Sequence, residues 1–128
     1  MKLYRYVVLI FAGLVLAVVM GACGTASGTP KDSLQAACAA VKNKDVAAYK
    51  KSLSKSKLAG MDAAAKQSNI STDELLKKYL DVMSCPASPE TGDEEINDDK
   101  ATLTLTNPST GDVDTYNFVR EEGLWKLN

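Results

Sequence analysis

Three cysteines are the most reactive side chains of this 128-residue chain, and they stand at positions 23, 38 and 85. A cysteine thiol can be acylated, oxidised to a disulfide or used as a metal ligand. The chain contains no histidine, the commonest general base and the commonest metal ligand. Histidine-based triads and ordinary zinc sites are therefore excluded, and the sequence predicts no metal site and no cofactor.

Cys23 follows a segment with the features of a secretory signal. Two cations precede an apolar run of 14 residues from Val7 to Met20, and Gly21-Ala22 comes directly before Cys23. This order resembles the signal of bacterial lipoproteins, whose cysteine is lipidated and becomes the mature N-terminus. The resemblance implies that residues 1–22 are removed and that acyl chains such as palmitate on Cys23 anchor the protein in a membrane.

Two alternatives to lipidation remain open. One is an uncleaved anchor helix, although a membrane span needs about 20 apolar residues and this run is shorter. The other is an ordinary secreted protein that keeps Cys23 as a free residue. All three place the protein outside the cytoplasm, and the leading interpretation places it in the cell envelope, lipid-anchored on the extracytoplasmic side of a membrane.

The other two cysteines, Cys38 and Cys85, form an even pair. In an oxidising compartment such a pair predicts one disulfide. The alternative is two buried free thiols that pack as small hydrophobic side chains. A redox-active pair is not expected, because neither residue belongs to a C-x-x-C motif.

Composition limits the architecture and the partners. Residues 23–29 make a short tether of small residues, and residues 30–128 are enough for one domain. Two of the 15 basic residues and none of the 16 acidic residues precede Cys23, so the side chains from Cys23 onward carry a net charge of −3. A weakly acidic domain of this kind predicts no binding to nucleic acid.

Helical periodicity dominates the first half of the domain. Pro30 starts a helix whose residues Leu34, Ala37, Cys38 and Val41 share one apolar face. Asp45 is placed to cap a second short helix, and a third is expected over residues 58–67.

The strongest helix start is Ser71, which forms a capping box with Glu74. That helix is predicted to run to about Ser84, before Cys85-Pro86. A disulfide would then join the first helix to the end of the last.

The acidic segment over residues 90–99 predicts a solvated loop, and it lacks the residue spacing of a calcium site. Strand patterns follow this segment. Residues 101–106 alternate apolar residues with threonine, and residues 113–121 and 124–127 continue the pattern. A two-residue turn at Glu122-Gly123 would pair Phe118 with Leu127 and Arg120 with Trp125. The sequence predicts an α+β domain with N-terminal helices packed on a curved antiparallel β-meander.

The order of elements and the final Phe118–Leu127 segment, with an acidic-Gly turn before Trp125-Lys126, resemble small lipoproteins of the nuclear-transport-factor-like, or cystatin-like, superfamily. The resemblance covers roughly residues 33–128. It implies a cone of helices laid in a curved sheet that can hold a small ligand. It carries over no catalytic residue, because function varies widely within the superfamily.

Aromatic residues are the candidates for the core or for a pocket lining. Tyr49 and Tyr79 lie on apolar helix faces, where a tyrosine can line a pocket or can be buried with its hydroxyl satisfied. Tyr116, Phe118 and Trp125 share one face of the predicted hairpin. A basic stretch of six lysines from Lys42 to Lys57 could face anionic lipid head groups or an acidic wall polymer, and it is interpreted as a solvated face.

Three hypotheses of function follow. The leading one is a non-catalytic, membrane-tethered envelope lipoprotein whose domain binds a small apolar ligand or an envelope protein. The second is an isomerase- or hydrolase-like enzyme that pairs a tyrosine with a buried carboxylate in its pocket. The third is a structural envelope lipoprotein, which would have no pocket.

Overall fold

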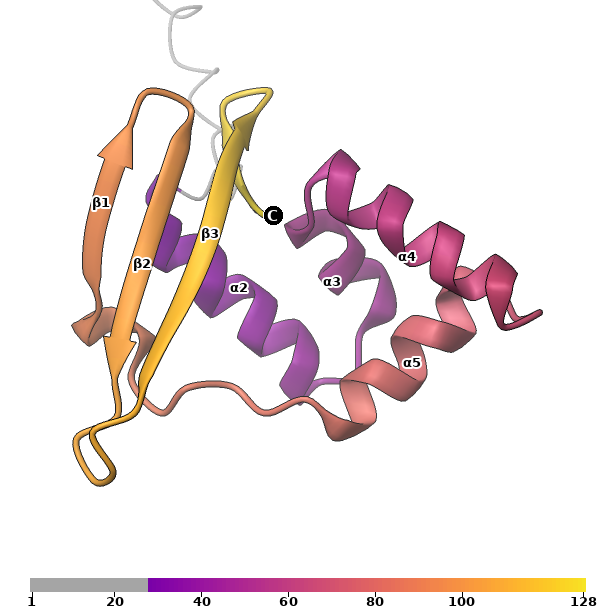
Figure 1. Ribbon diagram of the computed structural model, residues 1–128, viewed down its shortest axis with the longest axis horizontal. Coiled ribbons are helices and arrows are strands. Elements are labelled where there is room, and N and C mark those ends of the chain that lie inside the picture. Colours follow the sequence, from indigo (N-terminus) through magenta and orange to yellow (C-terminus); the bar gives the residue numbers. More distant parts are fainter. Residues whose placement is uncertain (1–27) are drawn as a thin grey trace, which may run out of the picture.

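The computed structural model describes residues 28–128, in which four α-helices precede a four-stranded antiparallel sheet (Figure 1). The helices are α2 (Pro30–Lys42), α3 (Val46–Ser52), α4 (Lys55–Gln67) and α5 (Thr72–Val82), and a short 3-10 helix, η1 (Pro89–Thr91), leads into the sheet. The strands are β1 (Asp93–Asn97), β2 (Lys100–Thr106), β3 (Val113–Glu121) and β4 (Leu124–Leu127). The predicted α+β class is confirmed.

The helices begin at side-chain caps. Asp45, Ser54 and Ser71 each accept a hydrogen bond from the backbone N–H three residues further on, which satisfies one otherwise unpaired donor of the first turn. The predicted capping box of Ser71 and Glu74 is present. The helix that it starts ends at Val82, two residues earlier than predicted.

The sheet is a simple meander in the order β1-β2-β3-β4. Phe118 pairs with Leu127 and Arg120 pairs with Trp125, so the register predicted for the last hairpin is confirmed. Both turn residues, Glu122 and Gly123, have positive φ angles of 53° and 78°. A two-residue turn of this kind matches the twist of the strands that it joins.

The acidic segment is the main correction to the predicted fold. Residues 90–99 were expected to be a solvated loop, but they contain the end of η1 and the whole of β1. β1 is an edge strand with mostly exposed side chains, including Ile96. It is held by backbone pairing with β2 rather than by buried side chains, and its acidic residues discourage pairing with another chain.

The core has two parts, and α2 contributes to both. Leu34 packs with the inner face of the sheet, whereas Ala37, Ala40 and Val41 pack with α3 and α5. Buried Ser33 also donates a 2.8 Å hydrogen bond from its hydroxyl to the carbonyl of Trp125. α2 therefore joins the sheet half of the molecule to the helical half.

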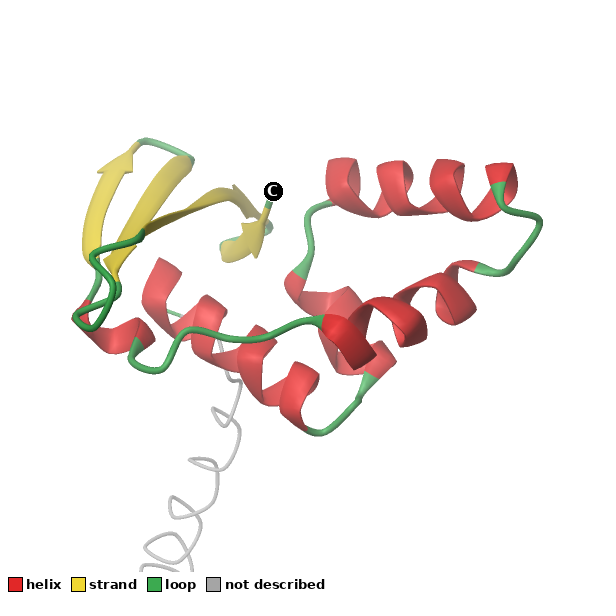
Figure 2. Ribbon diagram, turned by 60° about the horizontal axis from the view of Figure 1, so that its bottom comes forward, coloured by secondary structure: helices red, strands yellow, loops and turns green. Residues whose placement is uncertain are grey.

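Only part of the helical half lies against the sheet. α2 and α3 contact β4, and α2 also contacts β2, while α4 packs mainly on α5. Figure 2 shows the α4–α5 hairpin beside the sheet rather than over it.

Candidate functional site

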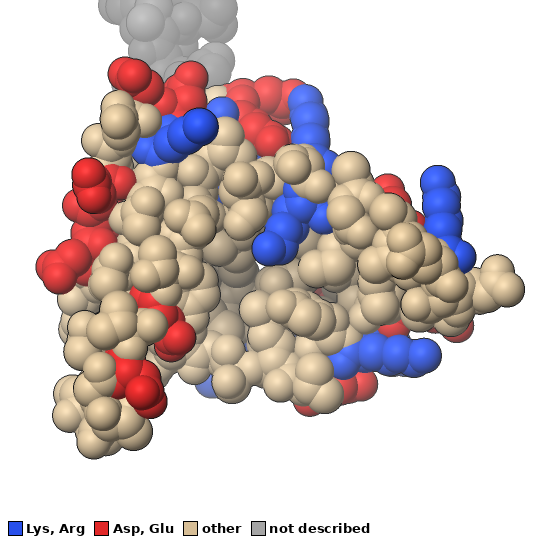
Figure 3. Space-filling view, in the orientation of Figure 1, with Lys and Arg blue, Asp and Glu red and all other residues tan. Residues whose placement is uncertain are grey.

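A cleft of about 290 Å³ lies between the sheet half and the helical half. It opens where the fourth strand stops: β3 has nine residues, but β4 has four and pairs only with Phe118–Glu121. Within residues 28–128, the part of β3 before Phe118 therefore has no strand on its outer side. Figure 3 shows the resulting hollow between the two halves of the molecule.

The cleft is lined by the four α-helices, by the segment after α5 and by the sheet. Its lining residues come from α2 (Leu34, Ala37, Cys38, Val41), from the α3 region (Tyr49, Leu53), from α4 (Lys57), from α5 and the following segment (Tyr79, Met83, Ser84, Cys85, Pro86) and from the sheet (Thr115, Tyr116, Asn117, Leu127, Asn128). Hollows of 400 to 440 Å³ lie elsewhere on the described surface, but only this one gathers the tyrosines.

Three of the five aromatic candidates lie at this cleft. Tyr49, Tyr79 and Tyr116 contribute to its lining from three separate elements. Phe118 and Trp125 instead pack in the core between α2 and the sheet, and each is 2% exposed. The guanidinium of Arg120 covers the Trp125 ring at 4.5 Å from its centroid, an arrangement typical of a cation–π contact.

Tyr49 is the most deeply placed of the three tyrosines. It is 3% exposed, and its hydroxyl donates a hydrogen bond of 3.4 Å to the Met83 sulfur. Burial, and next the nearby Tyr79, raise the pKa of Tyr49 from 10.0 to about 12. The phenol therefore stays neutral throughout the physiological range and presents an uncharged wall to the cleft.

Tyr116 and Tyr79 are closer to solvent. Tyr116 is half-buried, and burial followed by the charge of Asp114 raises its pKa above the ordinary value. Tyr79 is 41% exposed on α5. The cleft is thus dry on the side of Tyr49 and open to water on the side of Tyr79.

The predicted pair of cysteines is bonded. A disulfide joins Cys38 of α2 to Cys85 just beyond α5, with 5.7 Å between the two Cα atoms. It ties the first described helix to the end of the last, as the sequence predicted. Both cysteines line the cleft, so the bridge holds α2 and the segment after α5 in fixed positions along one wall.

One end of the cleft is polar. The hydroxyl of the buried Ser54 accepts from the Lys57 N–H at 3.0 Å and donates to the Asn128 side-chain oxygen at 2.9 Å. The Asn128 N–H in turn donates to the Asn117 carbonyl at 2.9 Å. These bonds hold the backbone of Lys57 beside the end of β4.

The sequence did not single out Lys57, because it is one of six lysines in the basic stretch. Three members of that stretch, Lys44, Lys50 and Lys55, pair with Asp81, Asp73 and Glu122 at 3.2, 2.9 and 3.5 Å. The position that distinguishes Lys57 depends on the α3–α4 corner and on the end of β4, which no local pattern reveals.

No aspartate or glutamate is among the lining residues of the cleft. The carboxylate whose charge acts on Tyr116, that of Asp114, lies outside the lining. Within residues 28–128 no group of three or more Cys, Asp or Glu residues is placed to hold a metal ion. The arrangement is suited to holding a molecule by contact and hydrogen bonding.

The predicted signal, lipidation site and most of the tether lie outside the described residues. The structure describes residues 28–128, and Cys23 lies before them. None of the helices in the described part of the chain has the length and apolar character needed to cross a membrane.

Comparison with known proteins gives no match. No protein-family model matches the sequence, and no curated protein or solved structure is significantly similar to it. The described residues form an α+β domain with a small cleft between its halves.

Proposed function

We propose that this protein is a lipoprotein of the cell envelope, tethered to a membrane through acyl chains on Cys23. The support is the order of cations, apolar run and small residues before that cysteine. The Cys38–Cys85 disulfide agrees with an oxidising compartment. Residues 24–29 extend to at most about 20 Å, so the domain would stay close to the membrane surface.

Membrane attachment can be tested by replacing Cys23. Wild-type protein is expected in the membrane fraction, with an intact mass that lacks residues 1–22 and is raised by acyl groups. Cys23→Ser should lose both the acyl groups and the shortened mass. A full-length, unacylated wild-type mass would show that the N-terminal segment is an anchor and not a signal.

We further propose that the domain binds a small, largely apolar ligand in the cleft without transforming it. The observation that carries this proposal is a 290 Å³ space lined by three tyrosines, aliphatic side chains and a disulfide, with no acidic residue. Sites for small molecules are concave and mostly apolar, with a few polar groups that orient the ligand. The presence of a cleft also favours binding over a purely structural role.

The nuclear-transport-factor-like superfamily is the family that we propose for the domain. The support is the order of helices followed by an antiparallel meander, together with a cleft beside the inner face of the sheet. The proposal concerns the fold and assigns no reaction, because proteins with one fold serve many functions.

A neutral probe tests cleft binding directly. We suggest titrating the full chain in phosphatidylcholine nanodiscs with octanamide and following the backbone amide signals by NMR. Shifts are expected at cleft residues such as Tyr49, Tyr116 and Asn117. Ser84→Trp should weaken binding at least about tenfold, because Ser84 is exposed at the cleft and an indole would occupy its opening.

The matched control is Ser68→Trp, at an exposed position after α4 that lines none of the four hollows. It should leave the titration unchanged. Equal weakening by both substitutions, or no cleft shifts in the wild type, would contradict the proposal. All variants share the same nanodiscs, so partitioning of octanamide into lipid is the same in each.

A protein partner is the second candidate, and one observation favours it. Among the described strands, β2 is the only partner of the β3 residues before Phe118, and the Asn117 carbonyl on the other side accepts from Asn128. Alternation along the strand therefore turns the N–H groups of Val113 and Thr115 toward the same open side. An extended peptide could add there as a strand.

Hydrogen exchange distinguishes this candidate. If a partner strand is present in the envelope, the amides of Val113 and Thr115 should exchange more slowly in intact membranes than in purified protein. Equal exchange in both samples would count against a strand partner and leave the small-ligand proposal in place.

A further inference from the structure

The cleft is chemically asymmetric. Lys57 is the only Lys, Arg, Asp or Glu among its lining residues, and Asn117 and Asn128 line the cleft with it. The rest of the wall combines aliphatic side chains, Met83 and the two cysteines with three tyrosines and the polar residues Ser84 and Thr115. A ligand that fills the cleft would meet apolar surface along most of its length and one cation at the polar end.

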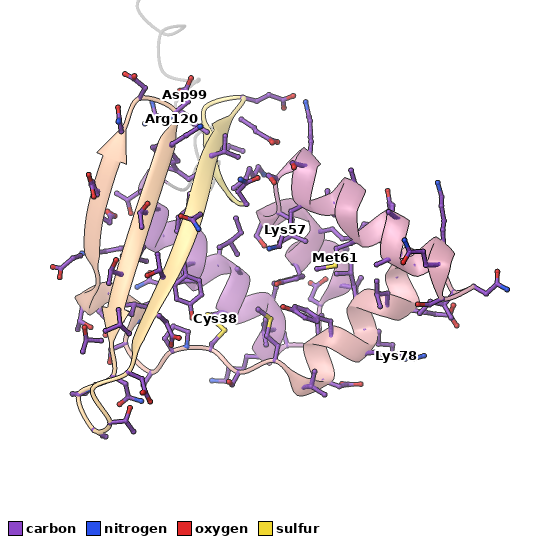
Figure 4. All side chains as sticks on the ribbon, in the orientation of Figure 1. Cys38, Lys57, Met61, Lys78, Asp99 and Arg120 are labelled. Carbon is purple, nitrogen blue, oxygen red and sulfur yellow. A yellow bond between two sulfur atoms is a disulfide. The ribbon has the colours of Figure 1, made fainter. Side chains whose placement is uncertain are left out.

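Lys57 is exposed, but its backbone at the start of α4 is held in place by neighbouring residues. Its backbone N–H is bonded to Ser54, which is 0% exposed and itself bonded to Asn128. In Figure 4 the Lys57 side chain points from α4 toward the space between α4 and the sheet, whereas Lys78 points outward from α5. The α4 corner therefore directs this cation toward the cleft.

The charges around Lys57 leave its ammonium available. The neighbouring lysines Lys44, Lys50 and Lys55 are each paired with a carboxylate, but within residues 28–128 Lys57 has no such ion pair. No Asp or Glu lines the cleft to oppose it. A cation with no partner beside an apolar surface is complementary to an anionic group on an apolar ligand.

The volume limits the size of that ligand. At about 30 Å³ for each water molecule in the liquid, 290 Å³ corresponds to roughly ten waters. A molecule with on the order of ten non-hydrogen atoms fits this space, which is the size of an eight-carbon chain with a carboxylate head.

We propose that the ligand is a medium-chain amphiphile with one anionic head group, a carboxylate, and that Lys57 binds this head. The inference rests on the proposed function of the cleft. The chain would lie against Leu34, Val41 and Tyr49, and the carboxylate would accept hydrogen bonds from the Lys57 ammonium and the amide groups of the polar end.

Three eight-carbon probes that differ in charge test the proposal. Octanoate is anionic, octanamide is neutral with the same number of non-hydrogen atoms, and octylammonium is cationic. Each is titrated at neutral pH into the full chain in phosphatidylcholine nanodiscs, with amide shifts as the signal. Octanoate should bind about tenfold more tightly than octanamide, and octylammonium should bind most weakly.

Substitution of the cation separates charge from shape. Lys57→Met keeps a long side chain in α4 and should lower the octanoate affinity about tenfold, while changing that for octanamide less than about twofold. Lys78→Met is the matched control and should change neither. High salt should weaken octanoate alone.

Each outcome has a distinct meaning. Three results would overturn the proposal: equal affinities for octanoate and octanamide, tighter binding of octylammonium, or unchanged octanoate affinity in Lys57→Met. The first would leave the cleft as a site for neutral ligands. If no probe shifts the cleft amides, the proposed function fails as well. Octanoate shifts confined to Lys78 and other remote lysines would also overturn the proposal.

Discussion

At the scale of single residues, Tyr49 joins the core to the cleft. Its ring packs among Leu53, Leu76 and Leu80, while its hydroxyl meets Met83 at the cleft wall. The phenol is therefore desolvated without having a charged partner. Its proton equilibrium reports directly on how dry that wall is.

The titration of Tyr49 gives the first prediction. Since its pKa is raised from 10.0 to about 12, the folded state holds the phenol proton more tightly than the unfolded chain does. This stabilisation is complete below about pH 10 and is lost as the pH rises toward about 12. Tyr49→Phe should therefore lose less stability than wild type across that alkaline interval.

The measurement is chemical unfolding at several alkaline pH values, with phenolate absorbance as a second signal. Tyr79→Phe, at the exposed side of the same cleft, is the control and should retain the late titration step. If every phenol of the folded wild-type protein titrates at the same pH as in the unfolded chain, Tyr49 is not buried as described.

Gly92 gives a second residue-scale prediction, because it lies under the sheet. A Cβ atom at this position would stand 2.5 Å from one Leu103 methyl carbon and 2.7 Å from one of Leu105. Both leucines are buried, so neither side chain can move away freely. Gly92→Ala should lower the free energy of unfolding by about 1–3 kcal/mol.

The matched substitution is Gly60→Ala, in the exposed interior of α4. A Cβ there has no neighbour within 4 Å, and alanine should stabilise the helix by up to about 1 kcal/mol. Thermal or urea unfolding of the two variants measures the difference. Destabilisation of the same size at both positions would contradict the close approach of the two leucine side chains to Gly92.

At the scale of secondary structure, α5 depends on the capping box at its start. The Ser71 N–H donates to the Glu74 carboxylate at 3.0 Å, and the Glu74 N–H donates to the Ser71 hydroxyl at 3.2 Å. The backbone hydrogen bond from Ser71, followed by that from its hydroxyl, lowers the pKa of Glu74. The box therefore favours the ionised carboxylate.

Acid unfolding tests this cap. Because the pKa of Glu74 is lowered on folding, its contribution is present above the ordinary pKa of 4.5 and is lost as the pH falls through the lower folded value. Glu74→Gln should remove this part of the pH dependence. Urea unfolding from neutral to acid pH is the measurement, and Glu95→Gln controls for the loss of an exposed carboxylate.

Local signals account for most elements that the sequence predicted. The caps at Asp45 and Ser71 and the turn at Glu122-Gly123 each involve only a few adjacent residues. The helix starts and the hairpin register can therefore be predicted from the local sequence. β1 escaped prediction because an edge strand is made by pairing with β2 and carries no buried apolar face of its own. The lengths of β3 and β4 were predicted, but the position of the cleft was not, because it depends on how the α4–α5 hairpin lies beside the sheet.

At the scale of the whole molecule, the disulfide and α2 hold the two halves together. The bridge closes a chain separation of 47 residues that includes α3, α4 and α5. α2 supplies buried residues to both core clusters, and Leu127 packs against both. The cleft lies between parts that these contacts fix in position.

Removal of the disulfide should therefore affect stability and binding together. Cys38→Ala with Cys85→Ala is expected to lower the free energy of unfolding by up to about 4 kcal/mol, from the loop-closure entropy of this separation. Octanamide should bind more weakly, because the wall made by the segment after α5 would no longer be tied to α2. Calorimetric unfolding and the nanodisc titration measure the two effects.

Reduction of the wild type should reproduce the double substitution. A double variant with unchanged unfolding temperature would show that the bridge does not restrain the unfolded chain, and unchanged octanamide affinity would show that it does not shape the cleft.

The most direct test of the central claim is the native intact mass of the protein extracted from its own membranes. We predict a chain that lacks residues 1–22, carries acyl groups and retains an additional non-covalent molecule of the size that the cleft admits. Ser84→Trp should lose that molecule, and Ser68→Trp should keep it. A wild-type protein with nothing bound, or a ligand retained equally by Ser84→Trp, would contradict the assignment of the cleft as the binding site.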